Sequence, residues 1–119
     1  MKKKNRLTRS RDFKQLKESG KSFYHPLFVL VSLRNGKPHS RAAVVASKVV
    51  GNAVVRNKVR RRSKSCLDQV WQNIDLGWDF VFYLRTAIVG AKQTEICYAI
   101  QHLLEQAGVL GEKYNNNVS

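Results

Sequence analysis

The chain has 119 residues, 43% of them hydrophobic, which is enough for one modest core and too few for two domains. Its net charge of +14 lies in residues 1–65, where 19 Lys and Arg face two acids, whereas residues 66–119 carry a net charge of −3. This distribution favours a polyanionic partner, nucleic acid before an anionic membrane surface, and the absence of a bilayer-length apolar stretch or secretory signal predicts a cytoplasmic protein with no membrane partner.

The first part of the chain is basic and then briefly helical. Residues 1–9 are polar and cationic, and we expect them to form a flexible arm that orders on binding. Ser10 is a favourable N-cap for a helix over Arg11–Ser19, which Gly20 would end. This helix is short and needs tertiary packing to persist. Residues 22–25 then predict a short extended piece, whose pairing the following proline interrupts.

Two longer strands are predicted next. Leu27–Leu33 is almost uniformly apolar, and Arg41–Ser47 combines small and β-branched residues. Asn35-Gly36 lies between them and is a strong hairpin signal, because both residues tolerate positive φ. Pro38 leaves a longer loop open as an alternative to a two-residue turn. The sequence predicts that the two strands pair with each other.

A strongly basic helix follows, with Asn52 as its natural N-cap and an end near Gln72. Six of the nine residues 56–64 are cationic, and residues 19–67 contain no acid. At the helical period, four apolar side chains share one side and the cations run along another, so we expect an anchored helix that presents its cations to an anion. The apolar stripe consists of Val55, Val59, Cys66 and Val70, and the cationic row consists of Arg56, Arg60 and Lys64 with Asn57 and Arg61 beside it. Arg62 projects near the stripe, so its stem is expected to lie along the edge of the core.

The rest of the chain predicts a third strand and a closing helix. Trp78–Leu84 is rich in aromatic and β-branched residues. A helix then opens at Gln93 or Thr94, buries one apolar face and ends at Gly108, and residues 111–119 resemble a frayed tail. The predicted order is helix, short strand, two strands, helix, strand and helix. This order is typical of a single α+β domain with helices layered on a small sheet.

No constellation of side chains predicts catalysis by the protein itself. The eight acids are scattered, and neither a phosphate-binding glycine loop nor a metalloprotease motif occurs. Cys66 and Cys97 form no CxxC, so we expect two small buried hydrophobes without a disulfide or a zinc site. His25, His39 and His102 are far apart in sequence and are expected to be ordinary histidines. We therefore predict no catalytic residue and no metal site in the protein.

The strands before the basic helix help to choose the nucleic acid. A helix–turn–helix needs a second short helix just before its recognition helix, and strands stand there instead. A groove between strands and a basic helix, with exposed aromatics beside it, suits single-stranded RNA, whose bases stack on rings. The aromatic candidates are Phe13, Phe23, Tyr24 and Phe28, each with core packing as its alternative role.

One stretch carries a family resemblance. The stretch over residues 51–61 resembles the RNR signature of the bacterial ribonuclease P protein subunit. It consists of Gly51-Asn52-Ala53-Val54, one further residue, and Arg56-Asn57-Lys58-Val59-Arg60-Arg61. Further pieces match in the family's order over residues 4–108: Arg6-Leu7, Asp12-Phe13, Phe28-Val29-Leu30, Ser47-Lys48 and residues 79–85. The resemblance implies an α-β-β-β-α-β-α fold with a left-handed βαβ crossover through the basic helix, against the usual right-handed rule.

The resemblance also implies a function and its residues. The family's protein binds a large catalytic RNA that, with Mg²⁺, removes the 5′ leader of precursor tRNA, and a cleft beside the basic helix grips the single-stranded leader. Contacts to the catalytic RNA are implied for Arg56, Asn57, Lys58, Arg60 and Arg61, with Lys48 and Asn52 nearby and Lys64 as the last cation of the row. For the leader cleft, Phe13 matches the family's aromatic, and Lys17 and Phe28 are the further candidates.

Three positions depart from the family pattern. Many relatives have a second aromatic one turn after Phe13, where this chain has Lys17, which would attract phosphate instead of stacking on a base. Some relatives have Tyr in the first long strand, where Val31 stands, and a lysine often follows Lys48, where Val49 stands. These departures bear on the leader cleft more than on the basic helix.

Composition, pattern and resemblance together predict the protein subunit of a bacterial-type ribonuclease P, monomeric within the ribonucleoprotein. Its partners would be the catalytic RNA and precursor tRNA, and the RNA would use Mg²⁺ and do the cutting. The alternative from another class is a structural RNA-binding protein, such as a ribosomal component, without a processing role. A protein-only nuclease is disfavoured because the sequence has no carboxylate cluster.

Overall fold

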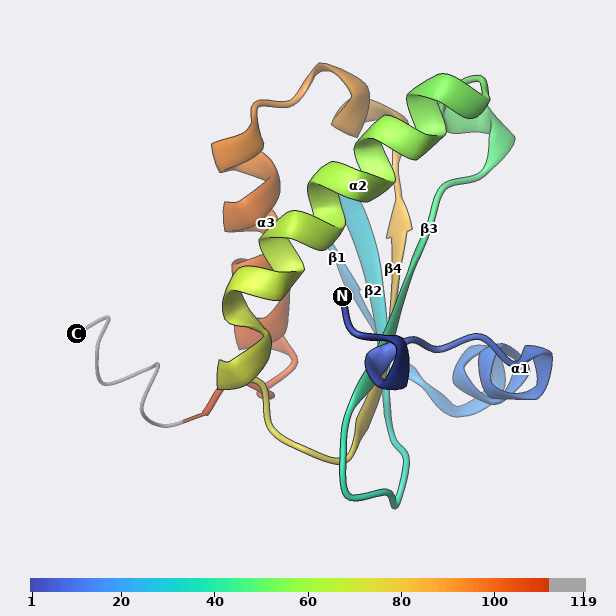
Figure 1. Cartoon of the computed structure of the whole chain (residues 1–119), viewed down its shortest axis with the longest axis vertical. Helices are drawn as coiled ribbons and strands as arrows, with labels where there is room; N and C mark the ends of the chain where they lie inside the picture. Colours follow the sequence, from blue (N-terminus) through green and yellow to red (C-terminus); the bar gives the residue numbers. More distant parts are fainter. Residues whose placement is uncertain (112–119) are drawn as a thin grey trace.

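A four-stranded sheet separates one helix from two others in the computed structural model, which describes residues 1–111 (Figure 1). The elements are α1 (Ser10–Ser19), β1 (Lys21–Tyr24), β2 (Phe28–Arg34), β3 (Arg41–Val45), α2 (Ala53–Val70), β4 (Trp78–Leu84) and α3 (Gln93–Gln106). The predicted α+β fold and its α-β-β-β-α-β-α order are confirmed. Of the predicted tail, residues 112–119 lie outside the described part, and no helix within residues 1–111 is both long and apolar enough to cross a bilayer.

The strand order β1-β2-β4-β3 differs from the predicted hairpin. β4 lies between β2 and β3, antiparallel to β2 and parallel to β3, so the prediction that Arg41–Ser47 pairs with Leu27–Leu33 is wrong. β4 is buried along almost its whole length, whereas β3 alternates between buried and half-buried residues. The strand that is apolar on both faces takes the central position. The turn signal itself is sound, because Gly36 has a φ of 67° and the Asn35 amide donates to Asp79 of β4 over 2.9 Å.

The two connections beside the sheet differ in kind. α2 joins the neighbouring parallel strands β3 and β4, which gives the βαβ crossover that the resemblance implies; its handedness stays a prediction. β1 and β2 form a hairpin instead, and the His25 N–H donates to the Phe28 carbonyl over 2.9 Å to close the turn. Pro26 lies in this turn, so it redirects the chain without interrupting the pairing, contrary to the prediction.

The sheet divides the core in two, with α1 on one side and α2 and α3 on the other (Figure 1). The larger cluster joins Phe80 and Phe82 of β4 to residues of α2 and α3. Of the six residues of the predicted α3 face, Ile96, Ala99, Ile100, Leu103 and Leu104 are buried, whereas Ala107 is partly buried at the C-cap. On the other side, Leu16 of α1 packs with Leu7 and Val81. Because α1 has only 10 residues, this packing is what keeps it helical.

The N-terminal segment, residues 1–9, is packed on the domain in this structure, and its flexibility before RNA binds stays a prediction. Its backbone joins the edge of β3, where Arg6 forms a parallel bridge with Ala42. The Leu7 N–H donates to the Ala42 carbonyl over 2.9 Å, and the Leu7 side chain is buried in the smaller cluster. Leu7 and Met1, which packs against the larger cluster, are thus the apolar residues that dock this polar segment.

A disulfide between Cys66 and Cys97 joins α2 to α3, with 4.9 Å between the two Cα atoms. The prediction of two unpaired cysteines is therefore wrong, although Cys66 is buried as expected. The partners are 31 residues apart, and only the packing of α3 against α2 brings them together. The bond fixes α3 against the basic helix.

Two of the three histidines meet where α3 passes β1. The ring centroids of His25 and His102 are 6.2 Å apart, and the Tyr98 ring stacks on His102 with centroids 6.1 Å apart. The Leu27 N–H donates to Nδ1 of His25 over 3.0 Å, a bond that requires this nitrogen to be unprotonated. Burial, and secondly the charge of His102, lower the pKa of His25. His25 is thus favoured in its uncharged state.

Candidate nucleic-acid interface

α2 begins where its backbone donors are capped. Asn52 is the N-cap, as predicted, and its side-chain oxygen accepts a hydrogen bond from the Val55 N–H over 3.0 Å. The chain before it makes a 3-10 turn over Lys48–Val50, and the side chains of Lys48 and Asn52 are exposed. Because the helix uses the Asn52 oxygen, the amide NH₂ is the part left for an outside ligand.

One side of α2 anchors the helix in the core. Three of the four predicted stripe residues are buried, and Val55 is partly buried. Ser63 and Leu67 are buried as well, and the predicted stripe omits both. Leu67 lies eight residues after Val59, so helical spacing alone was signal enough to find it. Ser63 gives no such signal, and it fits because its hydroxyl donates to the Val59 carbonyl over 2.8 Å.

The opposite side of α2 carries the predicted cations. Lys58 and Arg61 are exposed, whereas Arg56 and Arg60 are partly buried. Arg60 donates to the side-chain oxygen of Asn57, so these two candidate RNA ligands are already joined. We call this side the cationic face and define it as Arg56, Asn57, Lys58, Arg60, Arg61 and Lys64. Since residues 19–67 contain no acid, no carboxylate from α2 itself stands among these cations before Asp68.

Arg62 stands apart from the cationic face, as predicted. Its guanidinium donates to the Gln93 side-chain oxygen over 2.9 Å and to the Ala91 carbonyl over 3.1 Å. The Gln93 amide returns a hydrogen bond to the Arg62 carbonyl over 3.0 Å. Arg62 is therefore a structural cation that ties α2 to the start of α3.

An open hollow of about 750 Å³ lies beside the cationic face. The α2 side chains that line it are Asn57, Arg60, Arg61, Lys64, Ser65 and Asp68. Val44 of β3 lines it as well. Asp68 is the only acid in this lining, and its carboxylate lies 3.1 Å from the amino group of Met1. The hollow is therefore a cationic surface whose one negative charge is already paired.

A second hollow, of about 310 Å³, contains the predicted leader-cleft aromatic Phe13. Residues 42–45 of β3 and Lys64 of α2 also line it. Met1, Val44 and Lys64 line both hollows, so the two adjoin along a path from α1 across the edge of the sheet to α2. We call the two hollows together the α1–α2 groove.

The three predicted leader residues are not together. Phe13 lines the groove, and Lys17 is exposed one turn later on α1, outside the lining. Phe28 is 0% exposed and packs against Phe82 in the larger core cluster, so its placement in the cleft is wrong. Side chains alternate along β2, and Val31, not Phe28, packs on the α1 side. The groove is also lined by residues that the predictions did not assign to the leader cleft: Arg6, Leu7 and Thr8.

An ionic network fixes the α1 wall of the groove. Arg41 of β3 donates to the two carboxylate oxygens of Asp79 over 3.0 and 2.7 Å, and to Asp12 of α1 over 3.2 Å. The hydrogen bond to Asp79 is the main cause that raises the pKa of Arg41, against the opposing effect of burial. Because Asp12 is the residue before Phe13 on α1, the ion pair to Arg41 also helps to position the backbone that carries the Phe13 ring.

Several acids of the described part are used within the fold. Asp12 and Asp79 bind Arg41, and the Glu95 carboxylate accepts from the Lys92 N–H over 2.8 Å at the start of α3. No group of three or more His, Cys, Asp or Glu side chains within residues 1–111 is placed to hold a metal ion. The groove offers cations, amides and an aromatic ring, which are the groups that bind phosphates and stack on bases.

Comparison with known proteins gives one consistent family. The Ribonuclease P family model matches residues 1–108 of this chain. The ribonuclease P protein component of Herpetosiphon aurantiacus is 34% identical over 107 residues, which cover 90% of this chain and 87% of the relative. The ribonuclease P protein component of Bacillus mycoides is 33% identical over 110 residues, which cover 92% and 96% of the two chains.

Solved structures agree with the sequence comparison. The RNase P protein of Staphylococcus aureus has a TM-score of 0.82 and 27% identity, covering 90% of this chain and 98% of that one. The RNase P protein from Thermotoga maritima has a TM-score of 0.78, also at 27% identity, covering 85% and 96%. The basic helix, the groove and these matches lead to one conclusion: the chain belongs to the bacterial ribonuclease P protein family.

Proposed function

We propose that this protein binds a catalytic RNA through the cationic face and holds the single-stranded 5′ leader of precursor tRNA in the α1–α2 groove. The observation that carries the proposal is that the two hollows of the groove adjoin. Lys64 lines both hollows, so the cations that would bind one RNA adjoin the aromatic wall that would bind the other. Family membership makes the protein part of an RNA-processing enzyme.

The cationic face suits the phosphates of a folded RNA. Each phosphate that a Lys or Arg neutralises releases condensed counterions, and the amides of Asn52 and Asn57 add directional hydrogen bonds. Nε of Arg56 is buried and has no hydrogen-bond partner in the described part of the chain. A guanidinium with an unpaired buried donor gains more than a solvated one from an anionic partner.

The leader would lie along the edge of β3. The Phe13 ring can stack on an unpaired base, and Lys17, four residues later on the same side of α1, would meet a phosphate as the strand leaves the groove. In this proposal the RNA, with Mg²⁺, hydrolyses the phosphodiester bond. The protein, one copy in a cytoplasmic ribonucleoprotein, contributes binding and orientation.

The test is 5′ cleavage of precursor tRNA at low Mg²⁺ by the cognate RNA alone, the protein alone, and both together. We expect efficient cleavage only with both, because the protein supplies substrate and phosphate binding that Mg²⁺ otherwise provides. Cleavage by the protein alone would overturn the RNA-catalyst part of the proposal. RNA binding without any stimulation of cleavage would favour a structural RNA-binding protein instead.

Replacing Arg56 or Arg60 by alanine should weaken binding to the catalytic RNA and flatten its dependence on salt. Each lost phosphate contact is expected to reduce the log–log slope by about 0.7–0.9. Filter-binding titrations at several salt concentrations measure the slope. Lys92→Ala is the matched control, because Lys92 is exposed and lies outside the groove lining. A slope that falls equally in the control would show a general charge effect.

Replacing Phe13 by leucine should weaken binding of precursor tRNA without changing the affinity for mature tRNA. Leucine keeps apolar bulk but cannot stack, and base–aromatic stacking contributes about 1–3 kcal/mol per base. The measurement compares the holoenzyme's dissociation constants for the two tRNAs. If both constants rise together, Phe13 acts through the fold and not on the leader.

A further inference from the structure

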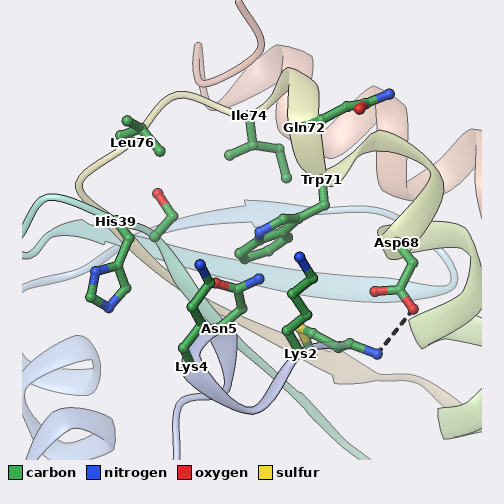
Figure 2. Close-up of a pocket in the computed structure, with 11 residues that line it drawn as sticks. Lys2, Lys4, Asn5, His39, Asp68, Trp71, Gln72, Ile74 and Leu76 are labelled. Atoms are coloured by element: carbon green, nitrogen blue, oxygen red, sulfur yellow. Dashed lines mark hydrogen bonds and ion pairs between the residues drawn. The ribbon is translucent and has the colours of Figure 1, made fainter.

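A hollow of about 470 Å³ lies at the C-terminal end of α2, beyond Asp68, and the function proposed above does not use it. Its size is within the range of small-molecule sites. Two distant parts of the chain form its walls: the N-terminal segment gives Lys2, Lys4 and Asn5, and the stretch after α2 gives Trp71, Gln72, Ile74 and Leu76. We call it the Trp71 pocket. Figure 2 shows the indole reaching into the hollow opposite Lys2 and Asn5, with His39 to the side.

One wall of the Trp71 pocket is flat and apolar. The Trp71 ring is half-buried, because it packs on the core cluster from outside, and its remaining surface lines the hollow. Leu76 in the same lining is 71% exposed, which is unusual for a leucine with an apolar neighbour at hand. A planar ring entering the hollow would find a stacking surface there.

The facing wall carries an unpaired amide. Asn5 is only 7% exposed, yet its side chain makes no hydrogen bond to any residue in the described part of the chain. A side-chain amide offers donors and an acceptor together, which matches the edge of a nucleobase. Arg56 Nε is the one buried side-chain polar atom without a partner within residues 1–111, so the Asn5 amide is not a buried orphan; it is available to a ligand because Asn5 lines the hollow.

The charge around the hollow favours an anion. Lys2 and Lys4 are exposed and line it, and the only acid in the lining is Asp68, which is paired with the amino group of Met1. Met1 and Asp68 also line the hollow beside the cationic face. An RNA bound to that face therefore reaches the Trp71 pocket without leaving the protein surface.

We propose that the Trp71 pocket binds one unpaired nucleotide of the bound RNA. The base stacks on the Trp71 indole, the Asn5 amide hydrogen-bonds to the edge of the base, and Lys2 and Lys4 bind the adjoining phosphates. The inference rests on the proposed RNA-binding function and adds a nucleotide site to it. The nucleotide belongs to the catalytic RNA or to precursor tRNA, and the experiment separates the two.

The first measurement uses Trp78→Phe, which leaves Trp71 as the only tryptophan. The probes are a short oligouridine and an abasic ribose-phosphate oligomer of the same length. Stacking predicts quenching of Trp71 fluorescence by the oligouridine and not by the abasic oligomer. Quenching by neither, or equally by both, overturns the proposal. The catalytic RNA and leader-bearing precursor tRNA are then titrated separately, and the source of the nucleotide is the one that quenches.

The second measurement compares affinities of variants in the full-length chain. Trp71→Leu should bind the quenching RNA about tenfold more weakly, whereas Trp71→Phe, which keeps a ring and most of the packing, should lose less. Lys2→Ala and Lys4→Ala should each reduce the salt slope by about 0.7, with Lys92→Ala as the unchanged control. Far-ultraviolet circular dichroism checks that the tryptophan variants fold.

The two proposals fail in different ways. If Arg56→Ala still weakens RNA binding while the Trp71, Lys2 and Lys4 variants bind like the parent chain, the nucleotide site is wrong and the proposed function stands. If the parent chain binds neither RNA, both proposals fall.

Discussion

Replacing Arg41 by alanine is expected to lower the free energy of unfolding by about 3–5 kcal/mol, because the substitution leaves the buried carboxylate of Asp79 without its charged partner. Asp79 is 5% exposed and receives two of its hydrogen bonds from the Arg41 guanidinium. Removing the guanidinium leaves that charge with the Asn35 amide alone among side-chain donors. Urea unfolding followed by circular dichroism gives the free energy directly.

Two variants sharpen this measurement. Arg34→Ala removes another arginine from the same sheet, but Arg34 is exposed and its guanidinium only covers the Trp78 ring at 5.1 Å, so about 1 kcal/mol or less is expected. Arg41→Lys keeps the charge but loses the bidentate contact to the carboxylate, so its loss of unfolding free energy should lie between those of Arg34→Ala and Arg41→Ala. Equal losses for Arg34→Ala and Arg41→Ala would contradict a special role for the network.

Reducing the Cys66–Cys97 disulfide is expected to lower the free energy of unfolding by about 2–4 kcal/mol. The bond closes a loop between residues 31 apart, and in the chain-entropy account it stabilises the fold by restricting the unfolded chain. Urea midpoints with and without a dithiol reductant measure the effect. Cys97→Ala should have the lower midpoint already and should not respond to the reductant.

For the cytoplasmic ribonucleoprotein proposed above, the reduced form matters because most cytosols keep thiols reduced. A titration of free thiols in the unfolded, unreduced protein shows which form is isolated. Two free thiols together with identical midpoints in both solutions would contradict the bond. Otherwise the difference between the midpoints gives the stability of the form without the cross-link.

The parts of the fold that follow from local chemistry could be predicted from the sequence. The Asn52 cap, the stripe of α2 and the buried face of α3 depend on neighbours within a few residues, and the structure has all three. Asn35-Gly36 is an example of a local signal that does not determine the strand order. The dipeptide reports a turn, which is present, but it contains no information on which strand fills the neighbouring position in the sheet.

The candidate site divides in the same way. The cationic face follows from helical spacing, but the groove depends on Phe13, Lys64 and the N-terminal segment meeting across the edge of β3. Residue type alone gave the wrong role for Phe28. An aromatic ring on a strand can stack on RNA or fill the core, and the face of the sheet on which it lies decides between the two. The disulfide between the two cysteines could not be predicted, because only the packing of α2 on α3 brings them together and their spacing in the sequence does not indicate that packing.

The docked N-terminal segment has a consequence for the order in which the protein assembles. A ribosome makes residues 1–9 before the parts of the chain against which they pack, which include Ala42 on β3, Asp68 on α2 and Trp71. At roughly 5–20 residues per second, the lysine-rich segment stays free for several seconds after synthesis, close to ribosomal and messenger RNA. Once docked, the segment is held to β3 by few backbone bonds, which favours its local release. Amide exchange at Leu7 would record that release, and a nucleotide in the Trp71 pocket would slow it, because the ligand binds only the docked form.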